Sequence, residues 1–119
     1  RADAVPGIVR GYKASMDAPA QLDHSLVPSS FYDAVARAMS YGARKYSPHN
    51  WRGGMAWDVP YSALLRHLFA WWGGEDRDPE SGFSHLDHSA AMLAFLIEHS
   101  VNPAYASLDT RYKGGQDNV

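Results

Sequence analysis

The residues best suited to chemistry lie in one short stretch, positions 74–88. Four carboxylates fall within six positions there, and two histidines three residues apart follow at once. A helix would place those two histidines on one face. Hard divalent cations such as Mg²⁺ take several carboxylate oxygens from a compact site, whereas imidazoles suit Mn²⁺ or softer metals. The stretch therefore predicts a metal site with these candidate donors: Glu75, Asp78, Glu80, His85 and His88.

The same stretch has a simpler interpretation as a solvated loop between two helices. Ser81 or Ser84 would then cap the next helix, with acids favourably close to its N-terminus. Because the histidine pair adjoins the acids, the metal site and the solvated loop are about equally well supported. The sequence leaves both interpretations open.

A second polar cluster spans residues 42–55. It combines three cations, an amide, three glycines and large aromatic residues. Lys45 can neutralise a phosphate, Trp51 or Tyr46 can stack on a base, and Asn50 can read a base edge. The alternative is a basic surface loop in which Trp51 fills part of the core, and the two interpretations are evenly balanced.

Three helices must position these clusters. Helical periodicity and turn residues predict them from Ser29 to about Tyr46, from about Pro60 to Gly73, and over about Ser84–His99. No strand pattern is convincing. The third helix is expected to bury a face made of Leu86, Ala90, Leu93, Ala94 and Ile97.

Two further polar residues lie on these helices. In an up-and-down bundle the start of the first helix lies near the end of the second, which would bring Asp33 towards Glu75. His67 lies on an apolar helix, where a satisfied core histidine is about twice as common as a ligand. Arg66 beside it can pair with an acid or a phosphate.

Composition excludes several classes of protein. The chain has 119 residues, one domain's worth, and it contains no cysteine, which excludes disulfide scaffolds, thiolate metal sites and a cysteine nucleophile. A formal charge of −2 argues against duplex binding, and no apolar run approaches the roughly 20 residues that span a bilayer. The HExxH, GxSxG and phosphate-loop patterns are absent, and so is a His-Asp dipeptide.

Taken together, the motifs resemble those of the phage-associated dATP/dGTP diphosphohydrolases, which are MazG-like all-α nucleotide pyrophosphohydrolases and include the MazZ enzymes of phages with 2-aminoadenine DNA. The resemblance covers about residues 26–100. In chain order it rests on Leu26-Val27-Pro28, Gly42, Lys45-Tyr46, Asn50-Trp51, Gly54-Met55, Arg66-His67-Leu68, Ala70-Trp71, Gly74-Glu75, Asp78, Glu80-Ser81-Gly82, His85-Leu86 and His88.

The resemblance implies a small antiparallel all-α bundle completed by homo-oligomerisation, as a dimer or tetramer. It also implies hydrolysis of a purine nucleoside triphosphate, dGTP in the MazZ setting, to the monophosphate and pyrophosphate with Mg²⁺ or Mn²⁺. Glu75-x-x-Asp78 matches the family's ExxD pattern, but no ExxE is present, and Asp33 stands where a glutamate is expected.

On this basis Glu75 and Asp78 are predicted to be the catalytic metal ligands, with Asp33 as a further acid. Glu80, His85 or His88 would complete or orient the ligand shell. The predicted nucleotide-binding residues are Lys45 and Arg66 for phosphates, Trp51 and Asn50 for the base, and His67.

The expected organisation is an irregular arm over 1–28, a helical catalytic domain over 29–103 and a tail over 104–119. An enzyme of this kind would work in the cytoplasm, that of the host cell if a phage encodes it, without contacting membranes or duplex nucleic acid. Two alternatives stay open: a dATP-directed diphosphohydrolase or triphosphohydrolase for pool control, and a non-enzymatic helical interaction module.

Overall fold

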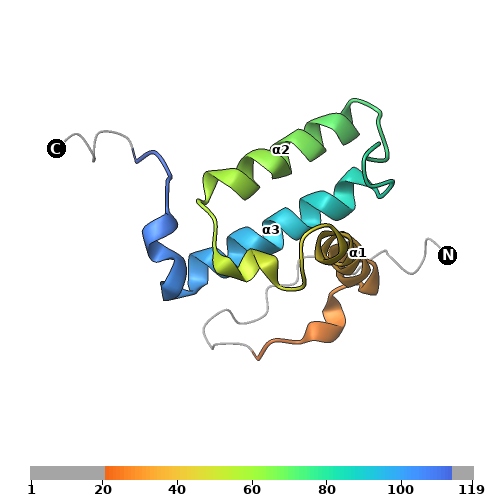
Figure 1. The fold of residues 1–119 in the computed structure, drawn as a ribbon. Helices are drawn as coiled ribbons and strands as arrows, with labels where there is room; N and C mark the ends of the chain where they lie inside the picture. The colour runs from red at the N-terminus through yellow and green to blue at the C-terminus, as the bar shows by residue number, and fades with distance from the viewer. Residues whose placement is uncertain (1–20, 114–119) are drawn as a thin grey trace.

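The computed structural model describes residues 21–113, which form a pair of helices crossed by a third (Figure 1). The three α-helices are α1 (Ser29–Lys45), α2 (Asp58–Trp72) and α3 (His85–Val101). Three short 3-10 helices accompany them: η2 (His24–Leu26), η3 (Asn50–Gly53) and η4 (Pro103–Leu108). The part of the chain described here contains no strand. The predicted all-α fold is confirmed.

Local signals in the sequence set the ends of the helices. The N–H of Gly73 closes α2 by donating to the Phe69 carbonyl at 3.0 Å. Ser84 caps α3, because its Oγ accepts from the Leu86 N–H at 3.0 Å. Pro103 then begins η4, so α3 ends just before it. The predicted helices therefore lie within a few residues of the observed ones.

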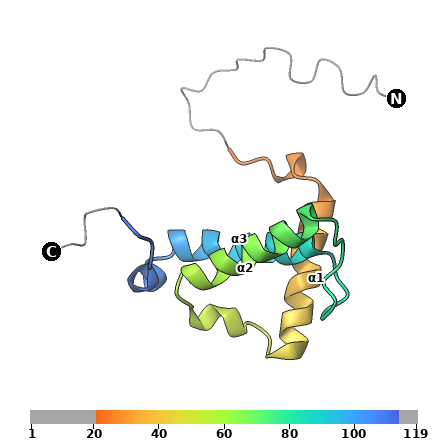
Figure 2. The ribbon, with the colours of Figure 1, turned by 90° about the horizontal axis from the view of Figure 1, so that it is seen from above.

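α1 crosses the antiparallel α2–α3 pair and packs mainly on α3 (Figure 2). The guanidinium of Arg37 makes a two-pronged pair with the carboxylate of Asp87, at 2.8 and 3.0 Å. The apolar core lies at this crossing and is small: Ala38, Ala91 and Phe95, surrounded by Met39, Trp51, Met55 and Met92. The up-and-down arrangement that would bring Asp33 towards Glu75 is not seen.

The prediction for the buried face of α3 is wrong. Leu86, Leu93 and Ile97 are exposed, and the buried face carries mostly polar residues: His85, Asp87, His88, Ser89, Ala91, Phe95 and His99. The physical reason is that α1 and α2 together cover the polar side of α3, where most of these groups find partners. The apolar stripe is left uncovered within a single chain.

The segment after α3 packs back on the helices. Tyr105 of η4 is buried, and the Thr110 hydroxyl both accepts from the Asp58 N–H and donates to the Asp58 carboxylate, at 3.1 and 2.7 Å. Part of the stretch expected as a tail thus contributes to the folded body, while its end and most of the N-terminal arm lie outside the described residues. None of the described helices is long and apolar enough to cross a membrane.

Candidate metal centre and ligand cavity

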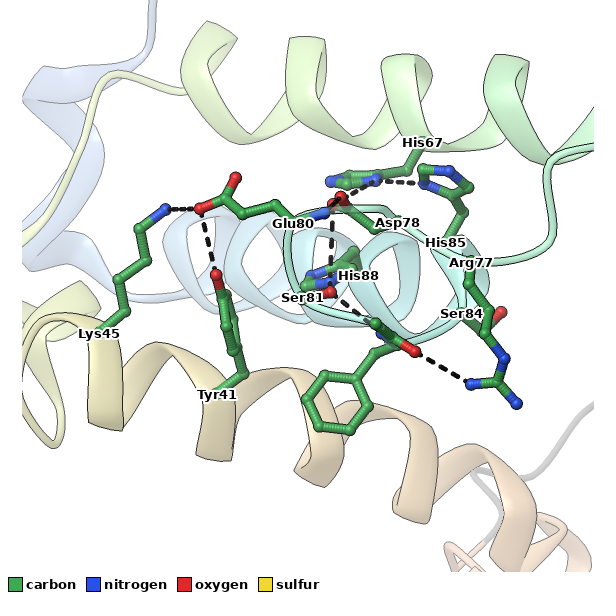
Figure 3. A network of polar contacts seen from close by, with 12 residues as sticks. Tyr41, Lys45, His67, Arg77, Asp78, Glu80, Ser81, Ser84, His85 and His88 are labelled. Carbon is green, nitrogen blue, oxygen red and sulfur yellow. Dashed lines mark hydrogen bonds and ion pairs between the residues drawn. The ribbon is translucent and has the colours of Figure 1, made fainter.

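Three side chains from three parts of the fold converge at one end of the α2–α3 pair (Figure 3). His67 comes from α2, Asp78 from the connection after it, and His85 from the first turn of α3. Each offers one donor atom, and the three atoms lie within 4.8 Å of one another. The Nδ1 atoms of His67 and His85 are 2.9 Å apart. Two imidazole nitrogens and a carboxylate oxygen therefore face one small volume.

Glu75 stands behind His85 and fixes its tautomer. Its Oε1 lies 2.7 Å from His85 Nε2, and a carboxylate can only accept, so we assign the ring hydrogen to Nε2. The Nδ1 atom of His85 then keeps its lone pair and directs it at the cluster. A carboxylate that orients a histidine from behind is a common arrangement around protein metal ions.

The carboxylate of Asp78 is held by its own loop. Its Oδ1 accepts from the Glu80 N–H at 2.8 Å, and its backbone pairs with Phe83 and Gly82 at 2.8 and 2.7 Å. Oδ2 is the oxygen directed at the histidines, 3.9 Å from His67 Nδ1. The turn therefore leaves one oxygen of Asp78 available to the cluster.

His88 extends the cluster along α3. Its ring stacks on that of His67, with centroids 4.7 Å apart, and its Nε2 lies 2.6 Å from Ser81 Oγ and 3.9 Å from Asp78 Oδ2. Burial lowers the pKa of His67, and the neighbouring His88 lowers it further. Burial also lowers the pKa of His88. The lowered pKa values favour the neutral form of both rings, which is the form that can bind a metal ion.

A second polar group joins α1 to the same loop. The Lys45 ammonium and the Tyr41 hydroxyl both donate to Glu80 Oε2, the latter at 3.1 Å. The bond from Lys45, then that from Tyr41, lowers the pKa of Glu80, and the pKa of Lys45 is raised chiefly by the same contact. The group places an ammonium and a hydroxyl on the α1 side of the cluster (Figure 3).

A cavity of about 660 Å³ opens beside these groups, between α1, α3 and the loop before α2. Its volume falls within the range of roughly 300–1,000 Å³ found for small-molecule sites. Its wall is mainly apolar, with Trp51, Met55, Met92 and Phe95 among the lining residues. His88 belongs to both the cavity wall and the histidine cluster, so the cavity and the cluster are adjacent.

Nine of the eleven predicted site residues fall into three groups. Asp78, His85, His88 and His67 lie together, with Glu75 behind them; Glu80 and Lys45 pair beside them; and Asn50 and Trp51 line the cavity. Asp33 and Arg66 are both exposed and form no hydrogen bond or ion pair with the cluster residues.

Tyr41 and Ser81 were missed as site residues. Tyr41 precedes Lys45 by four residues and so shares its helix face, a spacing that could have indicated it. Ser81 could be recognised only once the turn had brought it to His88.

The donors present fit a divalent cation. A cation between His67 and His85 would take the place of the hydrogen bond that joins their two Nδ1 atoms, and Asp78 would supply negative charge. Two imidazoles with one carboxylate suit Mn²⁺ and softer divalent ions better than Mg²⁺, which prefers oxygen.

The helices place imidazoles and carboxylates beside an apolar cavity. The class of protein is therefore an all-α protein with a candidate cation site next to a small-molecule pocket. Comparison with known families narrows the class. Residues 12–111 match the model of the family described as dATP/dGTP diphosphohydrolase, N-terminal, and the chain belongs to this family.

A curated relative, the dATP/dGTP diphosphohydrolase of Salmonella phage PMBT28, is 33% identical over 73 residues. The aligned part is 61% of this chain but 25% of the relative, so the chain spans about a quarter of the relative's length. No solved structure matches the chain.

Proposed function

We propose that the chain binds a purine deoxynucleoside triphosphate and, with a divalent cation, hydrolyses it to the monophosphate and pyrophosphate. The observation that carries the proposal is the adjacency of the cation cluster to the apolar cavity: His88 lines the cavity, and its ring stacks on that of His67 in the cluster. A nucleotide needs both environments, because its base is apolar and planar whereas its phosphates are highly charged. The family and the phage relative, named for dATP and dGTP, support the choice of substrate.

The base would occupy the apolar part of the cavity. Trp51 and Tyr46 are both in its wall, and Asn50 at the start of η3 offers an amide to a base edge. Stacking of a base on an aromatic ring is worth about 1–3 kcal/mol. Trp51 packs against the apolar core and also lines the cavity, so the core would hold it in place for a base.

The phosphates would lie at the polar edge of the cavity. Lys45 and Tyr41 line the cavity, and both end on Glu80. A triphosphate offers stronger acceptors than one carboxylate, so Lys45 would exchange Glu80 for phosphate oxygens on binding. Arg66, exposed on α2, is a second candidate for phosphate contact.

His67, Asp78 and His85 would hold the cation, with Glu75 orienting His85. When bound, a divalent ion neutralises phosphate charge and lowers the pKa of water. The histidine-rich donor set supports Mn²⁺ over Mg²⁺. Hydrolysis of dGTP would suit a role in 2-aminoadenine nucleotide metabolism in a phage-infected cell, within the cytoplasm.

A second copy of the chain would complete the bundle. The exposed stripe of α3 repeats at Leu86, Leu93, Ile97 and Val101, and Trp72 of α2 is 82% exposed. Exposed apolar residues at these spacings favour helix-to-helix association, which supports a homodimer or homotetramer. Size-exclusion chromatography with light scattering would test this association. A wild-type mass equal to that of one chain, with the same mass in Leu93→Lys, would contradict it.

Product chromatography tests the proposed reaction. Purified protein with Mn²⁺ and dGTP should release dGMP and pyrophosphate, and dATP under the same conditions measures base preference. Triphosphate and deoxyguanosine would indicate cleavage of the other bond, and absence of turnover with either nucleotide would contradict the proposal. Asp78→Asn should abolish turnover, while Asp76→Asn, a neighbouring acid outside the cluster, serves as the matched control.

A further inference from the structure

The C-terminal end of α3 contacts the loop before α2, residues 50–57. This loop places Trp51 and Met55 in the wall of the cavity. His99 is 1% exposed and touches that loop directly: its Nε2 accepts from the Met55 N–H at 3.2 Å. Its Nδ1 lies 2.8 Å from the Phe95 carbonyl, which can only accept. The ring is therefore neutral, with its hydrogen on Nδ1 and its lone pair directed at Met55.

η4 holds the same loop at neighbouring points. The ring of Tyr105 stacks on His99 with centroids 4.1 Å apart, and its hydroxyl donates to the Arg52 carbonyl at 2.7 Å. The Trp57 N–H donates to the Leu108 carbonyl at 3.1 Å. Together these bonds fix the backbone of the loop from Arg52 to Trp57.

The other side of this loop faces the cavity. Met55 and Trp51 both line it, and Trp51 stacks on Phe95 with centroids 5.0 Å apart. His99 itself is not a lining residue and has no contact with the cation cluster. Its ring lies beside that of Trp51, with centroids 6.4 Å apart, so it can influence a ligand through Trp51 and through the position of the loop.

We propose that His99 is a positioning residue for the base: it holds Met55 and Trp51 in the arrangement that binds the purine ring. The inference rests on the proposed function. Because His99 acts on the base end of the site, its loss affects nucleotide binding and leaves the hydrolytic step largely unchanged.

Two substitutions separate the contacts of the ring. The amide oxygen of glutamine extends about as far as Nε2 and can still accept from Met55, whereas that of asparagine extends only about as far as Nδ1. Since a lost hydrogen bond corresponds to about a threefold to tenfold change in binding, His99→Asn should raise KM for dGTP by about that factor. His99→Gln should restore most of the difference, and kcat should change less than about twofold in both.

A third variant guards against misfolding at this buried position. Tyr105→Phe keeps the ring stack and removes only the bond to Arg52, so it should raise KM in the same direction with kcat retained. Amide hydrogen exchange of Met55, measured without nucleotide, reports on the loop independently of activity. It should be faster in His99→Asn than in His99→Gln.

The outcomes are distinguishable. Faster Met55 exchange together with a KM increase at constant kcat supports the inference. The inference alone is overturned if the wild-type protein hydrolyses dGTP but KM is unchanged in both His99→Asn and Tyr105→Phe. It is also overturned if these variants lose only kcat. A wild-type protein that neither binds nor hydrolyses nucleotides overturns the proposed function and this inference with it.

Discussion

Substituting Gly54 by alanine should destabilise the fold and distort the loop that lines the cavity. Gly54 has φ 93° and ψ 151°, a region of backbone space that is essentially restricted to glycine. A Cβ built there would lie 2.9 Å from a δ-carbon of Leu108 and 3.3 Å from the ring of Tyr105. The substitution therefore combines backbone strain with a steric clash.

The two costs can be estimated separately. A residue forced into such a backbone region costs about 1–3 kcal/mol. Overpacking a filled site costs about another 1–3 kcal/mol. Together they amount to about 2–6 kcal/mol, a large part of the stability of about 5–15 kcal/mol that is usual for a domain.

Two other glycines provide matched controls. Gly74 has φ 106°, but a Cβ added there would have no neighbour within 4 Å, so Gly74→Ala carries the strain alone. Gly53 has neither a positive φ nor a close neighbour, so Gly53→Ala should be nearly neutral. Urea unfolding of the full chain, followed by far-UV circular dichroism, should rank the midpoints Gly53→Ala, then Gly74→Ala, then Gly54→Ala, from most to least stable.

The difference between Gly54→Ala and Gly74→Ala isolates the clash. It should be at least about 1 kcal/mol, which is about 4 °C or more in Tm for a domain of this size. Adding Leu108→Val, which removes the closest atom, should recover part of the loss. Equal destabilisation by the two alanine variants would refute the reasoning, because the clash would then contribute nothing.

Three further substitutions test other parts of the account. Arg37→Leu leaves the carboxylate of Asp87 buried without its partner and should lower Tm. The decrease should be clearly larger than for Arg44→Leu, which removes an exposed cation from the same helix. Similar Tm values for the two variants in thermal melts would contradict this. Lys45→Met should raise KM for dGTP about tenfold or more while Arg44→Met leaves it unchanged, as steady-state kinetics would show. Glu75→Gln should weaken Mn²⁺ binding about 10- to 100-fold in calorimetry, and an unchanged affinity would remove its assigned role as an orienting group.

Local patterns in the sequence were sufficient to predict the helices and part of the site. Gly73 and Pro103 end helices for reasons contained in the residues themselves, and a spacing of three placed His85 and His88 on one face. Ser84 was one of two candidate caps, and it is the one that caps α3.

The rest depends on long-range packing that a single sequence does not contain. His67 was interpreted as a core residue about twice as readily as a ligand, because nothing near it in the chain reveals that Asp78 and His85 lie beside it. The buried side of α3 was mispredicted for a similar reason. Counting apolar residues selects the leucine stripe, whereas the place where α1 crosses α3 decides which face is covered.

The central claim is that a divalent cation binds between His67, Asp78 and His85, next to the cavity. Anomalous scattering from crystals soaked with Mn²⁺ and a non-hydrolysable dGTP analogue measures this directly. The account predicts a manganese peak bonded to those three side chains, with the phosphates on the side of Lys45 and the base against Trp51. Manganese bound only at exposed acids such as Asp33, or no bound manganese at all, would contradict it.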